Sequence, residues 1–138
     1  MKKIILISCV SKKRSISTEA KDLYISPLFK LNLKYAIQLN PSSIYILSAK
    51  YGLLNLEDQV EPYEQTLNRM KVNERREWSK RVLEQLGHVT SLQDDQFTFL
   101  AGSRYRQFLV PHLKHVKIPL EGLGIGYQLQ KLKGLTAQ

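Results

Sequence analysis

The stretch that decides the fold stands near the start of the chain: residues 3–9, Lys-Ile-Ile-Leu-Ile-Ser-Cys. Its apolar residues follow one another without the alternation that a half-exposed strand would show. Such a run is typical of a strand that is buried on both faces, as in a parallel sheet with helices on both sides. We therefore expect this segment to lie inside the sheet of an α/β protein.

Segments of strand and helix character alternate along the rest of the chain. Three more strands are expected, at residues 44–47, 97–101 and 116–120. Four helices are expected. The first begins at Ser26-Pro27, and the second is capped by Asn73 and ends at Gly87. The third follows Ala101 and is weakened by Pro111, and the fourth follows Gly126. Residues 49–70 suggest an irregular stretch. The pattern predicts a single domain over residues 1–138, with a four-stranded, mainly parallel sheet in the order 2-1-3-4 and helices on both faces.

Polar and small residues follow every predicted strand. In such a sheet, ligands bind beyond the carboxyl ends of the strands, where the strand order reverses. The residues expected to bind a nucleic acid or a nucleotide there are Ser8, Ser11, Lys12 and Lys13, then Ser48, Lys50 and Tyr51, then Arg104 and Tyr105, then Gly122, Gly124 and Gly126. Their hydroxyl, ammonium and backbone N–H groups suit a phosphate or a carboxylate.

Three tyrosines are expected to converge near the lysines at this edge. Tyr51 and Tyr105 follow two strand ends, and Tyr63 comes from a loop that must return across the same edge. Together they predict a ring-lined slot suited to a flat base. The alternative is that the rings pin the loop to the core, and that the spacing of Tyr105 with Phe108 and Leu109 places it inside the protein.

The charge of the chain favours a phosphate-rich partner. Lys and Arg number 21 against 12 Asp and Glu, a formal net charge of +9. Residues 1–52 hold nine Lys and Arg against two acids, and residues 96–138 hold six against one. If the two ends of the chain meet in the fold, one face is strongly positive. A generally basic protein without a nucleic-acid partner is the alternative.

Several kinds of site lack their parts. The single cysteine, Cys9, excludes a disulfide within the chain. His112 and His115 have no neighbouring carboxylate or cysteine to complete a metal site, so we expect neither a metal nor a cofactor. Neither the Gly-Lys-Ser/Thr signature of a phosphate-binding loop nor a Gly-x-Ser-x-Gly motif is present. The longest apolar run, residues 4–7, is too short to span a bilayer, so we expect a cytoplasmic protein without a membrane partner.

Five separate blocks resemble the DUF6884 family of bacterial and phage proteins. They are Leu-Ile-Ser-Cys-Val-Ser-Lys-Lys (6–13), Ile-Leu-Ser-Ala-Lys-Tyr-Gly-Leu-Leu (46–54), Glu-Pro-Tyr-Glu-Gln-Thr-Leu-Asn-Arg-Met (61–70), Leu-Ala-Gly-x-x-Tyr (100–105) and Pro-Leu-x-Gly-Leu-Gly-Ile-Gly-x-Gln-Leu (119–129). More distantly, the chain is similar to the YaaA family of peroxide-stress proteins, although Cys9 stands where that family has proline. The resemblance implies DNA or nucleotide involvement and a role in stress.

The wider set to which these families have been compared has the four-stranded architecture of the uracil-DNA glycosylases. Those enzymes use an acid or amide after the first strand and often a histidine after the fourth. Here Ser and Lys follow the first strand, and Glu121 and glycines follow the fourth.

Three functions follow from these observations. The first is a DNA-binding protein of a stress or damage response, which needs the basic face and the tyrosines. The second is a base-processing enzyme, a glycosylase-like hydrolase acting on a modified base. Glu121 and Cys9 are its candidate catalytic residues, and Glu61 or Asp22 would be alternatives. The third is a binder of small nucleotides or nucleosides. The oligomeric state is left open.

Overall fold

Five strands form the main sheet of the protein, whose computed structural model describes residues 1–8 and 13–137. Across the sheet, the parallel strands are β3 (Ser43–Ser48), β1 (Lys3–Ser8), β6 (Gln96–Leu100) and β7 (His115–Lys117). Their order agrees with the predicted succession 2-1-3-4. The predicted count of four strands is wrong, because β4 (Gly52–Asn55) adds an antiparallel strand beside β3.

The strand β1 lies inside the sheet, as the run of apolar residues predicted. It pairs with β3 on one side, from Ile4 opposite Ser43 to Ser8 opposite Leu47, and with β6 on the other. The side chains of residues 4–7 are at most 2% exposed. Burial of this strand on both faces explains why its sequence has no polar alternation.

The extra strand β4 arises from a tight turn after β3. The Ser48 hydroxyl accepts a hydrogen bond from the backbone N–H of Tyr51, with 3.0 Å between the two atoms. Gly52 then adopts φ +77°, a left-handed conformation that glycine reaches without a steric penalty. The chain can therefore reverse and pair again with β3, in a stretch that was expected to be irregular.

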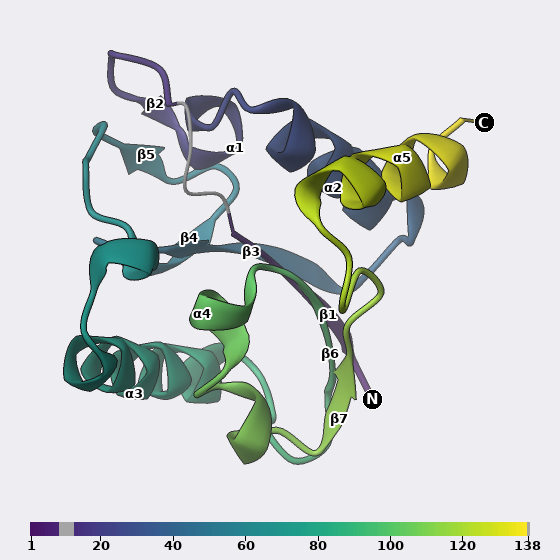
Figure 1. Cartoon of the computed structure of the whole chain (residues 1–138). Helices are drawn as coiled ribbons and strands as arrows, with labels where there is room; N and C mark the ends of the chain where they lie inside the picture. The colour runs from purple at the N-terminus through teal and green to yellow at the C-terminus, as the bar shows by residue number, and fades with distance from the viewer. Residues whose placement is uncertain (9–12, 138) are drawn as a thin grey trace.

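Helices cover both faces of the sheet, as predicted. Figure 1 shows α2 (Pro27–Gln38) and α5 (Ile125–Leu135) side by side on one face, and α3 (Val72–Val89) and α4 (Ser103–Arg106) on the other. Trp78, Val82 and Leu86 form the buried stripe of α3. None of the helices that the structure describes combines the length and the apolar character needed to span a bilayer.

The helix boundaries test the predicted caps. Ser26 does cap α2, because its hydroxyl accepts a hydrogen bond from Phe29 N–H over 3.2 Å. The predicted cap Asn73 is wrong, because the N-cap of α3 is Lys71, two residues earlier, and Asn73 lies inside the helix. The Glu74 carboxylate accepts a hydrogen bond from Lys71 N–H, with 3.0 Å between the two atoms. The helix also continues past Gly87 to Val89.

Short elements occupy segments without strong periodicity. The strands β2 (Thr18–Glu19) and β5 (Gln59–Val60) pair antiparallel, and α1 (Ala20–Leu23) follows β2 beside them (Figure 1). Two 3-10 helices also occur, η1 (Leu67–Arg69) and η2 (Val110–His112). Pro111 lies in η2, so the helix that was expected to continue from Ala101 ends at Arg106.

Candidate functional site

A cavity of about 260 Å³ lies at the carboxyl ends of β1 and β6, where the strand order reverses. We call it the switch-point cavity. Its polar lining comes from five parts of the chain: Ser8 at the end of β1, the N-cap Ser26 and Asn32 of α2, Asn68 of η1, Gly102 and Tyr105 after β6, and Gln128 of α5. Parallel sheets bind their ligands at this place because the strand ends and the following turns expose backbone and side-chain groups there.

Asn32 is the distinctive residue of the switch-point cavity. The side chain is 2% exposed, and its Oδ1 atom has no hydrogen-bond partner among the residues that the structure describes. A buried acceptor left without a partner costs about 1–3 kcal/mol. The Asn32 carbonyl is therefore an acceptor that a donor entering the cavity could satisfy.

The floor between β1 and β6 is held by Ser8. Its hydroxyl accepts a hydrogen bond from the backbone N–H of Gly102 over 3.3 Å, which joins residues 94 positions apart in sequence. The hydroxyl still has one proton to donate. Ser8 thus both fixes the two strand ends and presents a polar atom to the cavity.

A second cavity of about 340 Å³ adjoins the first, and we call it the arginine cavity. The two share Ala101, Gly102 and Gln128 in their linings. Arg106 lines the arginine cavity, and its buried Nε atom has no partner among residues 1–8 and 13–137. Because no Asp or Glu of the described residues lines either cavity, the guanidinium charge faces this space without a carboxylate in the lining.

A row of lysines and tyrosines lies at the same end of the molecule, and we call it the lysine–tyrosine row. Lys13 Nζ lies 4.6 Å from the centre of the Tyr63 ring, and Lys50 Nζ lies 5.3 Å from the centre of the Tyr51 ring. The two rings meet edge to face, with 5.8 Å between their centres. The two ammonium groups therefore lie against the two rings of one aromatic pair. Each contact between lysine and ring is stabilised by the attraction of the cation to the face of the ring.

The Tyr63 ring is the fixed part of this row. Its hydroxyl and the Tyr24 hydroxyl form a buried hydrogen bond over 2.5 Å, and the two rings meet edge to face at 6.4 Å. Tyr63 is 8% exposed, whereas Tyr51 is half-buried. Tyr51 is thus the member of the pair with ring surface left for another molecule.

An open hollow of about 690 Å³ borders the row at Lys50. Arg81 lines it and donates from Nη2 to the Lys50 carbonyl over 3.2 Å. Glu74 and Glu77 also line it, so the hollow carries both signs of charge.

Residues 4–134 match the model of DUF6884, a family of unknown function. The chain belongs to the DUF6884 family. No curated protein and no solved structure matches this chain. The fold and the cavities of this DUF6884 member therefore rest on its own structure, and its similarity to the YaaA family stays a prediction.

Four of the candidate residues of this DUF6884 chain lie together in the lysine–tyrosine row: Lys13, Lys50, Tyr51 and Tyr63. Ser8 lies at the end of β1, in the lining of the switch-point cavity. Ser48 lies at the end of β3, but it is fully buried and its hydroxyl accepts from Tyr51 N–H, which gives it a structural part. Cys9, Ser11 and Lys12 fall outside the described residues.

Tyr105 lies in the core rather than in a slot with Tyr51 and Tyr63. It is 3% exposed, its ring meets Trp78 edge to face at 5.6 Å, and its hydroxyl accepts from Leu67 N–H over 3.4 Å. Tyr105 still contributes to the lining of the switch-point cavity. The helical spacing that suggested a core position was the better guide.

The residues after β7 and β6 are spread out. Glu121 is exposed in the turn after β7 and lines neither cavity. Gly122, with φ +81°, lines the arginine cavity, whereas Gly124 caps α5 and Gly126 lies in its first turn. Arg104 is exposed on α4.

The sequence interpretation missed Asn32, Arg106 and Gln128. A signal for Asn32 existed: it lies three residues after Phe29 and four before Ala36, both on the buried face of α2. A polar residue at that spacing indicates a buried amide, which needs a partner.

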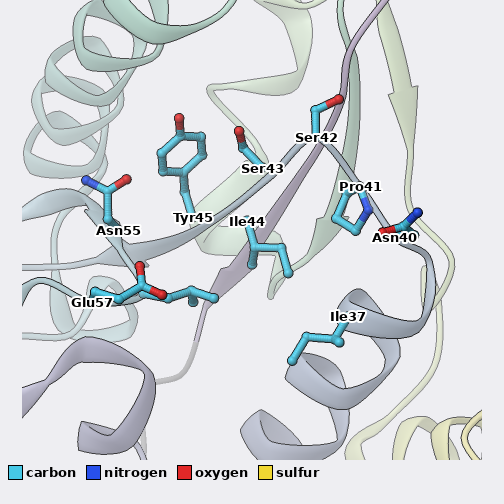
Figure 2. Close-up of a pocket in the computed structure, with 10 residues that line it drawn as sticks. Ile37, Asn40, Pro41, Ser42, Ser43, Ile44, Tyr45, Asn55 and Glu57 are labelled. Carbon is cyan, nitrogen blue, oxygen red and sulfur yellow. The ribbon is translucent and has the colours of Figure 1, made fainter.

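A separate hollow, of about 390 Å³, lies at the opposite edge of the sheet (Figure 2). Its lining includes Asn40 and Ser43 near the start of β3, and Asn55 and Glu57 after the end of β4. Asn40, Asn55 and Glu57 are exposed, so water can satisfy them without a ligand. This hollow is not at the edge where the sequence predicted a site.

Proposed function

We propose that this protein is a nucleic-acid-associated protein that binds DNA at the carboxyl edge of its sheet, in a stress or damage response. The observation that carries the proposal is the lysine–tyrosine row, in which Lys13 and Lys50 are held on the faces of Tyr63 and Tyr51. The predicted similarity to the YaaA family supports DNA as the partner.

The lysine–tyrosine row combines the two chemical elements that single-stranded nucleic acid requires. Ammonium groups bind the phosphate backbone, and an aromatic ring stacks on a base of any sequence. Lys13 and Lys50 contact ring faces, which leaves their charge available to a phosphate. Tyr51, half-buried beside Lys50, offers the ring.

The wider charge of the chain supports the same partner. The net charge is +9, and the pairing of β1 with β6 and of β6 with β7 brings the basic N-terminal and C-terminal segments into one sheet. Among residues 1–8 and 13–137, the ion pair found joins Lys21 to Glu19 at 3.5 Å, at an exposed position. Most cations are thus not neutralised by neighbouring carboxylates, and an external polyanion would gain from contact with them.

Binding agrees with the geometry better than hydrolysis does. A base-processing enzyme would need a general acid or base beside its ligand. Glu121 and Glu61 are exposed and lie outside the linings of the two cavities, and Asp22 borders a different hollow. Cys9 falls outside the described residues, and Glu74 and Glu77, in the hollow beside Lys50, are exposed carboxylates. The proposed function is therefore binding.

The test is a salt titration of affinity for a fluorescent, single-stranded thymidine oligonucleotide. The wild-type logarithm of affinity should fall linearly with the logarithm of salt concentration. The double variant Lys13→Gln, Lys50→Gln should reduce that slope by about 1–2 units, since each lysine that contacts a phosphate contributes about 0.7–0.9. The matched control is Lys80→Gln, Lys133→Gln, which removes two exposed lysines from α3 and α5.

Two outcomes would overturn the proposal. The first is a wild-type protein whose affinity for the oligonucleotide is undetectable at low salt. The second is a slope that the Lys13, Lys50 variant and the Lys80, Lys133 control change equally, because the row would then act only as part of a general positive charge.

A further inference from the structure

The geometry points to a nucleoside monophosphate as the ligand of the two adjoining cavities, with the base in the switch-point cavity and the phosphate in the arginine cavity. This inference rests on the proposed function, because it names the unit of nucleic acid that enters the edge of the sheet. It requires that a single nucleotide, free or at an unpaired position in a strand, leaves the stack and is held by the protein.

The first step concerns Asn32 and the base. Asn32 lines the switch-point cavity, and its buried Oδ1 atom has no partner among the described residues. All four DNA bases present N–H groups on their edges, and an amide oxygen accepts from such groups. The entry of a base would satisfy this acceptor. A ligand without an N–H group would bind much more weakly, because the buried Asn32 oxygen would stay without a hydrogen bond.

The second step concerns size. The switch-point cavity holds about 260 Å³, somewhat below the roughly 300–1,000 Å³ of pockets that take drug-sized ligands. A single flat ring system fits that space, and a larger ligand must extend outside it. Leu28, Leu100 and Ile125 supply the apolar surface that a ring face would contact.

The third step concerns Arg106 and the phosphate. The arginine cavity lies next to the switch-point cavity, and its lining contains Arg106 and Ser103 but no described carboxylate. The buried Arg106 Nε has a hydrogen to donate and no partner among the described residues. A guanidinium and a hydroxyl are suitable donors for a phosphate, which accepts strong charge-assisted hydrogen bonds.

The fourth step concerns the boundary between the two cavities. Ala101 and Gly102 line both of them, and a Cβ atom placed on Gly102 would meet nothing within 4 Å. The space above Gly102 is therefore open, and a sugar could lie there with its base and its phosphate on either side. Gly102 has φ −62° and ψ 158°, so a larger residue at this position is conformationally allowed.

The experiment measures binding of the four deoxynucleoside 5′-monophosphates and of deoxyribose 5-phosphate by titration calorimetry. At least one mononucleotide should bind more tightly than the base-free sugar phosphate. Asn32→Leu should reduce this preference about tenfold, since one hydrogen bond is lost, and leave deoxyribose 5-phosphate unchanged. Arg106→Gln should weaken both kinds of ligand about tenfold or more.

Gly102→Val should block both cavities and abolish binding without loss of the fold. The matched controls are Gln38→Leu on α2, Lys80→Gln on α3 and Gly87→Val on α3, which lie at exposed positions outside both cavities. Each variant is first checked for an unchanged circular dichroism spectrum and a cooperative melting transition.

Either of two results would overturn the inference: no mononucleotide binds better than deoxyribose 5-phosphate, or Asn32→Leu leaves the preference intact. The oligonucleotide salt titration separates this failure from that of the proposed function. A normal salt slope with no mononucleotide preference would overturn the inference alone. A mononucleotide preference that depends on Asn32, with no oligonucleotide affinity, would overturn DNA binding and support the nucleotide site.

Discussion

The indole of Trp78 donates a hydrogen bond from Nε1 to the backbone carbonyl of Ser48, with 2.9 Å between the two atoms. The bond joins the middle of α3 to the end of β3, directly before Lys50 and Tyr51 leave the sheet. Trp78 is 4% exposed, so its side chain is buried between α3 and the sheet. One side chain thus supports both the core and the start of the lysine–tyrosine row.

We expect Trp78→Ala to lower the free energy of unfolding by about 3–5 kcal/mol, because it opens a cavity beneath α3. Trp78→Phe should cost less, about 1–3 kcal/mol, because it leaves the buried Ser48 carbonyl without its donor but keeps a ring. Urea denaturation measures both. If Trp78→Ala kept wild-type stability and lost oligonucleotide binding, the residue would belong to the binding surface instead.

Asn32→Leu should raise the free energy of unfolding by about 1 kcal/mol. The substitution replaces a buried acceptor that has no described partner with an apolar side chain of similar size. Stability gained by removing a polar group from a cavity indicates that the group is kept for binding. Gln38→Leu on the exposed side of the same helix is the control, and it should change stability little. A loss of stability in Asn32→Leu would show that the amide is satisfied within the fold.

The parallel part of the fold could be predicted because its signals are local. The unbroken apolar run at residues 4–7 indicates a strand buried on both faces, and Ser26-Pro27 indicates a helix start. The strand β4 could not be predicted in the same way. It depends on the left-handed conformation of Gly52 and on Gln85, which accepts from Leu53 N–H over 2.9 Å from a position 32 residues away.

The position of the site in the fold could be predicted from the sequence better than the residues that form it. Residues that directly follow strands, such as Ser8, Lys13 and Lys50, can be placed at the carboxyl edge from topology alone. Asn32 reaches the same edge from the body of a helix, and the way α2 and α5 pack against the sheet decides what it meets. Local spacing contains no information about that packing.

Gly52→Ala should destabilise the turn between β3 and β4. The left-handed φ of +77° costs an alanine about 1–2 kcal/mol, and the new methyl group would overlap Gln85 Oε1, which would have to leave Leu53 N–H. Gly122→Ala is a matched control, since its φ is +81° but its Cβ would meet nothing within 4 Å. Thermal unfolding should show a larger loss for Gly52→Ala than for Gly122→Ala. Equal losses would mean that the Gln85 contact adds no cost.

Asp95 should make stability depend on pH in the acid range. Its carboxylate accepts from Ser91 N–H over 2.8 Å and from Lys2 N–H over 2.9 Å, and these bonds lower the pKa of Asp95 below its usual value. A pKa that is lower in the folded state than in the unfolded state gives stability that is complete above the unfolded pKa, about 3.9. That stability is lost as the pH falls toward the folded pKa.

Asp95→Asn should therefore cost about 1.5–3 kcal/mol near neutral pH, the range for hydrogen bonds to a charged group. The difference from wild type should shrink as the pH falls below about 4, because Asp95 then takes up its proton in the unfolded protein, and it should vanish once the folded protein is protonated too. Urea denaturation at about pH 7 and about pH 3 measures it, and Asp94→Asn at the exposed neighbouring position is the control. A difference that is the same at both pH values would rule out the charge as its source.

The two tyrosines of the lysine–tyrosine row should separate binding from stability. Tyr51 is half-buried and meets Tyr63 edge to face at 86°, so the two rings cannot both stack on one base, and the base must lie on the Tyr51 ring. Tyr51→Leu should weaken single-stranded oligonucleotide binding about tenfold at an unchanged melting temperature. Tyr127→Leu is the control, because Tyr127 is 69% exposed on α5, outside the row.

Tyr63→Phe should do the opposite. It removes the hydroxyl that pairs with Tyr24 and so should cost about 0.5–1.5 kcal/mol of unfolding free energy. It keeps the ring on which Lys13 lies, so the oligonucleotide affinity and its salt slope should not change. Urea denaturation measures the stability of both variants, and the fluorescence anisotropy of the labelled oligonucleotide measures their affinity on the same preparations. If Tyr51→Leu lost stability with its affinity intact, the Tyr51 ring would only hold its loop against the core, and the cationic part of the row alone would remain to bind DNA.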